Sequence, residues 1–111
     1  MGRLGVVLGS SAAGPGGAEM AAAANRAGAE VLQRHGSPYA LPHRIDHVAN
    51  MRSLRDARCD RVLAIGSVGS LRTDLPVGSL VSPDDFIALG TAAVTSLDDE
   101  RAHATPGFDP G

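Results

Sequence analysis

The fold is decided by residues 59–86, whose sequence is CDRVLAIGSVGSLRTDLPVGSLVSPDDF. The segment from Arg61 to Ile65 predicts a strand, and the glycines and serines from Gly66 to Ser70 predict the loop after it. The segment from Gly78 to Leu89 predicts a further strand, interrupted at Pro83. A strand that ends in small residues leaves backbone N–H groups open, and concave arrays of such groups suit anions. The stretch therefore indicates an anion site at the end of a strand.

Strands and helices alternate in the residues before this stretch. Leu4 to Leu8 is an apolar run bounded by Gly9 and Ser10, and it predicts a buried strand. Residues 18–27 and 46–58 predict helices, residues 29–33 a second strand, and residues 34–44 a loop. Strands that alternate with helices imply parallel pairing with helical crossovers. We therefore expect an α/β fold with a mainly parallel (mixed) sheet flanked by helices.

The length and composition exclude several classes of protein. A chain of 111 residues has room for one domain, and we expect residues 1–97 to form it and residues 98–111 to be a flexible tail. The net charge of −2 gives no general attraction for nucleic acid. The sequence has no apolar run long enough for a membrane span or a signal peptide. The single cysteine, Cys59, cannot form an intramolecular disulfide. These features are typical of a cytoplasmic protein.

Polar residues that could bind an anion follow each of the first three predicted strands: Ser10, then Arg34 and His35, then Gly66 and Ser67. The carboxyl ends of parallel strands open on one edge of a sheet, where ligands bind in such folds. A guanidinium can hold a phosphate with two parallel hydrogen bonds, and imidazole, hydroxyl and backbone N–H groups can add others. The alternatives are a helix-capping serine, a solvated Arg-His pair and an ordinary turn. His43 and His47 have no third ligand placed with them, so we expect no metal.

Three pieces of the sequence resemble the purine nucleoside phosphorylase superfamily, and most closely its methylthioadenosine phosphorylase branch. The pieces are LGVVLGS at 4–10, QRHG at 33–36, and the block from Ala49-Asn50-Met51 through Gly69-Ser70-Leu71 to Phe86-Ile87. The order and spacing within the last block make it the most specific piece.

The resemblance implies a pentosyltransferase of purine salvage that is cytoplasmic and homotrimeric. Such an enzyme cleaves the N-glycosidic bond of a purine nucleoside with inorganic phosphate and releases the free base and a (thio)ribose 1-phosphate. By the same resemblance the phosphate-binding residues are Ser10, Arg34, His35, Gly66 and Ser67. The co-substrate is phosphate, and no metal or organic cofactor is implied.

The sequence also departs from the family pattern. The interval from Ser10 to Arg34 is shorter than is typical, and Gly66 stands where relatives often have threonine, which leaves only backbone contacts at that position. The family's nucleoside-binding residues and purine-protonating aspartate belong to a C-terminal half that this sequence lacks, so we assign no catalytic residue. We expect a truncated phosphorylase domain that binds phosphate and has impaired or no activity.

Two other functions stay open at this point. The first is a non-catalytic fragment that binds phosphate or joins longer relatives in an oligomer. The second is a Rossmann-type half that binds NADP, with Gly9 to Gly17 as the pyrophosphate loop and Arg34 at the 2′-phosphate. Against the second, the glycine spacing is not G-x-G-x-x-G, and no acidic residue ends the second strand. The nucleoside that a complete enzyme would prefer is not indicated.

Overall fold

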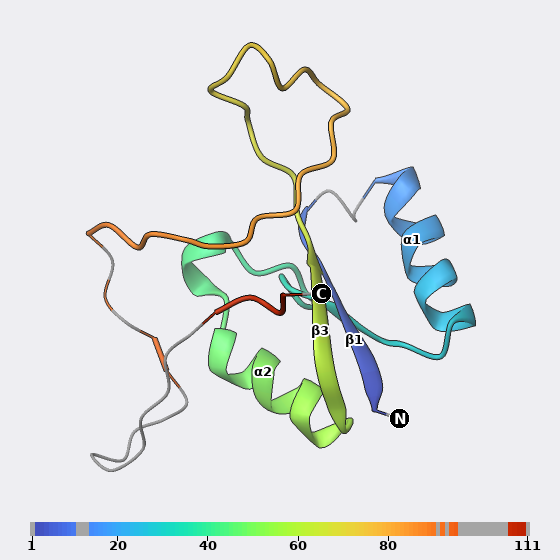
Figure 1. Ribbon diagram of the computed structural model, residues 1–111. Helices are drawn as coiled ribbons and strands as arrows, with labels where there is room; N and C mark the ends of the chain where they lie inside the picture. Colours follow the sequence, from blue (N-terminus) through green and yellow to red (C-terminus); the bar gives the residue numbers. More distant parts are fainter. Residues whose placement is uncertain (1, 11–13, 91, 93, 96–106, 111) are drawn as a thin grey trace. The chain divides into compact units, whose positions relative to one another are not determined.

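A computed structural model of the chain describes residues 2–10, 14–90, 92, 94–95 and 107–110. The chain divides into two compact units, residues 1–68 and 69–111, and each is described by itself. Within the described ranges, every helix and strand belongs to the first unit (Figure 1). In chain order they are β1 (Arg3–Leu8), α1 (Pro15–Arg26), β2 (Glu30–Gln33), a short 3₁₀ helix (Pro42–Arg44), α2 (His47–Asp56) and β3 (Cys59–Ile65).

The three strands form one parallel sheet in the order β2-β1-β3. The register pairs Val6 of β1 with Val31 of β2 on one side and with Leu63 of β3 on the other. The central strand β1 holds most of the buried apolar residues, namely Val6, Val7 and Leu8, and Leu8 is fully buried. The predicted α/β class and parallel pairing are confirmed for these strands.

Helices α1 and α2 lie on opposite faces of the sheet (Figure 1). Alternate residues of a strand point to opposite faces. On one face Val6 and Leu8 pack with Ala29, and Met20 of α1 packs against this cluster. On the other face Gly5 lies under Leu54 of α2. In doubly wound sheets with this strand order, ligands bind at the carboxyl ends where the strand order reverses, which here is between β1 and β3.

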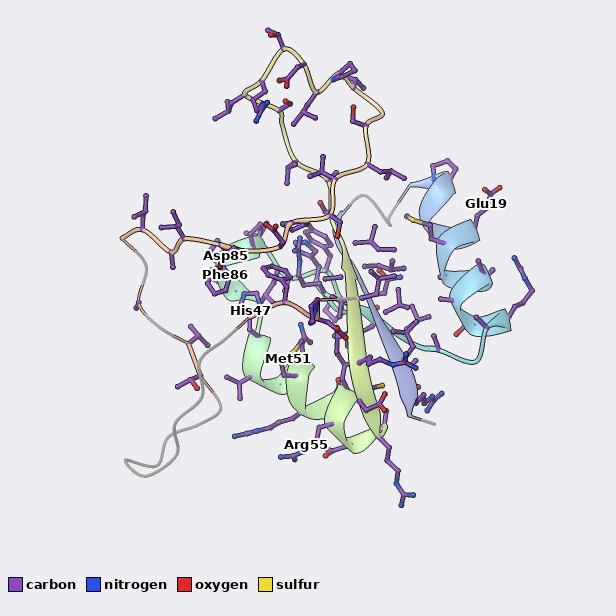
Figure 2. The ribbon with its side chains drawn as sticks, in the orientation of Figure 1. Glu19, His47, Met51, Arg55, Asp85 and Phe86 are labelled. Carbon is purple, nitrogen blue, oxygen red and sulfur yellow. The ribbon has the colours of Figure 1, made fainter. Side chains whose placement is uncertain are left out.

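The helix ends follow from local sequence. Helix α1 begins at Pro15, three residues before the predicted start, because proline fits the first helical turn, where its missing N–H is not needed. Asp46 caps α2, since its Oδ1 accepts a hydrogen bond of 2.8 Å from the Ala49 N–H. The predicted position of Asp46 at the start of this helix is therefore confirmed. Glu19 of α1 and Arg55 of α2 project away from the sheet (Figure 2).

The strand predicted over residues 78–89 is wrong, because the described residues of the second unit include no strand and no helix. A strand is stable only when a neighbour satisfies its backbone groups and covers its apolar face. Here Leu80 and Ile87 are almost fully exposed, and nothing in this part of the unit pairs with their backbone. The apolar composition alone was therefore misleading. The parallel sheet of the chain is limited to β1, β2 and β3.

An exposed ion pair joins two described residues of the second unit. The Arg72 guanidinium donates two hydrogen bonds to the two carboxylate oxygens of Asp74, and the Nε–Oδ1 distance is 2.9 Å. This contact lowers the pKa of the Asp74 carboxyl and raises the pKa of Arg72. In the same unit the rings of Phe86 and Phe108 meet edge to face, with centroids 6.1 Å apart.

Two expectations concern the rest of the chain. The predicted tail, residues 98–111, lies mostly outside the described residues, so the domain boundary at residue 97 stays a prediction. The part of the chain that the structure describes contains no helix with the length and apolar character needed to cross a membrane.

Candidate anion-binding site

Backbone hydrogen bonds bring the carboxyl ends of the three strands together. The Gly9 N–H donates to the Ile65 carbonyl at 3.0 Å, and the Arg34 N–H donates to the Leu8 carbonyl at 2.9 Å. These bonds extend the sheet one residue beyond the end of β1 and beyond the end of β2. As a result the residues that follow β1, β2 and β3 begin at one edge of the sheet, as the sequence predicted.

The Arg34 guanidinium lies directly over Gly9. A Cβ atom built on Gly9 would lie 3.1 Å from Arg34 Nη2 and 3.6 Å from its Cζ. It would also lie 3.4 Å from the carbonyl oxygen of Ile65 in β3. Gly9 has the same parity along the chain as Gly5, so the guanidinium lies on the α2 face of the sheet. The missing side chain at Gly9 is therefore what lets the cation reach the boundary between β1 and β3.

The backbone of Arg34 is fixed on two sides. Its N–H is bonded to β1, and its carbonyl accepts a hydrogen bond of 3.0 Å from the Asn50 side-chain amide of α2. Asp46 caps the same helix and stabilises its first turn, which lies next to Asn50. Asn50 thus connects α2 to the residue that carries the guanidinium.

The His35 ring is held in one orientation. Its Nδ1 lies 2.8 Å from the Ala40 carbonyl oxygen, and the Ala40 N–H donates to the His35 carbonyl at 2.7 Å. The Tyr39 ring stacks on the imidazole with a centroid distance of 4.4 Å and an interplanar angle of 7°. Gly36 has a φ of +70°, a conformation that glycine adopts without strain, and it turns the chain immediately after His35. His35 is buried, and the residue keeps 6% of its surface exposed.

Two buried nitrogen atoms at this site have no hydrogen-bond partner within the described residues: Arg34 Nε and His35 Nε2. A buried polar atom without a partner costs about 1–3 kcal/mol, and such atoms are rare in folded proteins. A bound oxyanion would satisfy the Arg34 N–H, because guanidinium N–H groups match the geometry of phosphate oxygens. The Arg34 N–H therefore favours an anion as its missing partner.

The other predicted site residues lie where their strands end. Ser10 directly follows Gly9, and Gly66 and Ser67 directly follow β3; all three are exposed. Over the described ranges, no hydrogen bond joins the side chain of Ser10 or Ser67 to Arg34 or His35. The structure thus brings Arg34 to the ends of β1 and β3, whereas phosphate binding by all five residues stays a prediction.

The sequence analysis missed three contributors to this site: Gly9 as the seat of the guanidinium, Asn50 as the support of Arg34, and Tyr39 as the stacking partner of His35. Gly9 and Asn50 lie inside the pieces that carry the family resemblance, which was the available signal. Among the described residues no group of three or more metal-ligating side chains could hold a metal ion.

The comparisons with known proteins decide the family. The family model described as "Phosphorylase superfamily" matches residues 25–110, a range that includes Arg34, His35, Asn50, Gly66 and Ser67. The chain belongs to the phosphorylase superfamily. Because the match begins at residue 25, Gly9 and Ser10 lie outside it.

Curated superfamily members with sequence similarity include nucleoside phosphorylases. The chain is 41% identical over 80 residues to a probable 6-oxopurine nucleoside phosphorylase of Archaeoglobus fulgidus, a match that covers 71% of this chain and 32% of that protein. It is 45% identical over 58 residues to a probable S-methyl-5′-thioinosine phosphorylase of Methanocaldococcus jannaschii, covering 51% of this chain and 23% of the relative. It is 39% identical over 70 residues to an S-methyl-5′-thioadenosine phosphorylase of Hyperthermus butylicus, covering 62% and 26%.

The chain therefore spans about a third or less of the length of these relatives. No solved structure matches it at a significant level.

Proposed function

We propose that this chain supplies the phosphate-binding part of a purine nucleoside phosphorylase. The complete reaction would cleave the N-glycosidic bond of a purine nucleoside with inorganic phosphate and yield the free purine and a pentose or thiopentose 1-phosphate. The observation that carries the proposal is the Arg34 guanidinium that lies over Gly9 with its buried Nε unpartnered, in a chain of the phosphorylase superfamily.

The proposed site would act by positioning and by charge. Arg34 would bind two phosphate oxygens, and His35 Nε2 would bind a third. The hydroxyl groups of Ser10 and Ser67 and the N–H groups of Gly66 and Ser67 would complete the shell. Breaking the glycosidic bond builds positive charge on the sugar. A phosphate held next to that charge stabilises the transition state and is also the nucleophile.

The substrate class is a purine nucleoside, and the choice among 6-oxopurine and methylthio nucleosides is left open, since similar relatives carry both kinds of name. No residue of this chain is assigned to purine or sugar recognition. We infer that the 111-residue chain binds phosphate and does not turn over nucleosides. A cytoplasmic location and a homotrimeric assembly of the complete protein also belong to this proposal.

A thermal-shift titration with inorganic phosphate tests the proposal, with Arg34→Ala as the site variant and Arg55→Ala as the control. Arg55 is an exposed arginine of α2 whose guanidinium pairs with Asp56, the next residue. Phosphate at a hundred times its Kd stabilises a protein by about 2.7 kcal/mol. We expect this gain in the wild type and in Arg55→Ala and its loss in Arg34→Ala. An equal gain in all three proteins would remove Arg34 from the site.

Incubation with phosphate and either inosine or methylthioadenosine tests the inference on turnover. We expect no release of free base, whereas steady release would show that the chain holds a complete active site. NADPH in the same thermal-shift series tests the dinucleotide alternative. Stabilisation by NADPH at concentrations where phosphate has no effect would favour that alternative over the phosphorylase proposal.

A non-catalytic role in assembly is a second candidate, and the edge of the sheet favours it. Parallel sheets are normally covered on both faces, yet Val62 and Leu63 of β3 keep 51% and 50% of their surface exposed. This alternative commits to a longer superfamily member as the partner. Light scattering of the chain alone and mixed with such a protein tests it. A monomer that stays monomeric in the mixture would contradict it.

A further inference from the structure

We draw no further inference here: the strongest candidate, the outer edge of β3 with the half-exposed Val62 and Leu63, belongs to the assembly role already described, and nothing in the part of the chain that the structure describes shows what covers it.

Discussion

Two glycines on the same face of β1 and its continuation allow a matched test of the site. Replacing Gly9 by alanine places a methyl group 3.1 Å from Arg34 Nη2, about 0.4 Å closer than the roughly 3.5 Å of an ordinary contact. The end of the Arg34 side chain can move by that amount, so we expect a stability change within about 1 kcal/mol. The moved guanidinium would lose the alignment of one charged hydrogen bond to phosphate, which is typically worth about 1.5–3 kcal/mol. Phosphate affinity should therefore fall by about tenfold or more.

Gly5→Ala is the control. Its methyl group would lie 3.0 Å from Leu54 Cδ2 and 3.3 Å from Cys59 Sγ, inside the packed interface between α2 and the sheet. Overpacking of this kind costs about 1–3 kcal/mol. We expect Gly5→Ala to lower the urea midpoint and to leave the phosphate affinity of the folded protein unchanged. The reasoning is refuted if Gly9→Ala keeps the wild-type phosphate affinity in a calorimetric titration, or if the two variants lose the same affinity.

Three further predictions concern the support of the site and the two units. Asn50→Ala removes the hydrogen bond to the Arg34 carbonyl. Denaturant unfolding should show a free energy of unfolding lower by about 0.5–1.5 kcal/mol. Calorimetry should show weaker phosphate binding. Leu54→Ala should cost about 2–5 kcal/mol in denaturant unfolding, because Leu54 is the buried residue by which α2 packs on the sheet. The pKa of Asp74 should be lower than that of an ordinary aspartate in an NMR titration and return to normal in Arg72→Gln.

A different result would contradict each of these three predictions. Ser53→Ala, one turn further along α2, removes an exposed hydrogen bond to the Asn50 carbonyl, and an equal loss of phosphate affinity there would assign no special role to the Asn50 amide. A Leu54→Ala protein as stable as the wild type would place α2 off the sheet. Because the Asp74 pKa is lowered, the Arg72 contact favours folding above the unfolded-state pKa and loses this effect as pH falls through the folded-state pKa. An Asp74 titration insensitive to Arg72 would contradict the ion pair.

The sequence was sufficient for those elements whose stability is decided by their own residues and by a nearby partner. The apolar run Leu4–Leu8 forms the buried central strand, and Asp46 caps α2, because both signals act over a few residues. The strand predicted over residues 78–89 failed for the opposite reason. Its apolar residues need a neighbouring strand, and the described residues provide none. Apolar composition could not reveal that absence.

The candidate site was predicted in outline and not in detail. The order of strands and loops was enough to expect Arg34 at the carboxyl edge of a parallel sheet. Two contacts of Arg34 join residues that are far apart in the chain. The position of its guanidinium over Gly9 depends on the register of the strands, and the hydrogen bond from Asn50 depends on the position of α2. The orientation of the His35 ring depends on the Ala40 carbonyl, which no residue pattern indicates.

The most direct test of the central claim is a map of backbone and guanidinium NMR signals during a phosphate titration. The account predicts that the Arg34 Nε–H and the Gly9 amide shift most, because the anion lies at the carboxyl ends of β1 and β3. It also predicts no change at Arg3, which pairs with Glu30 at the start of the sheet. Saturable shifts confined to Arg3 or Arg72, with Arg34 and Gly9 unmoved, would contradict the site.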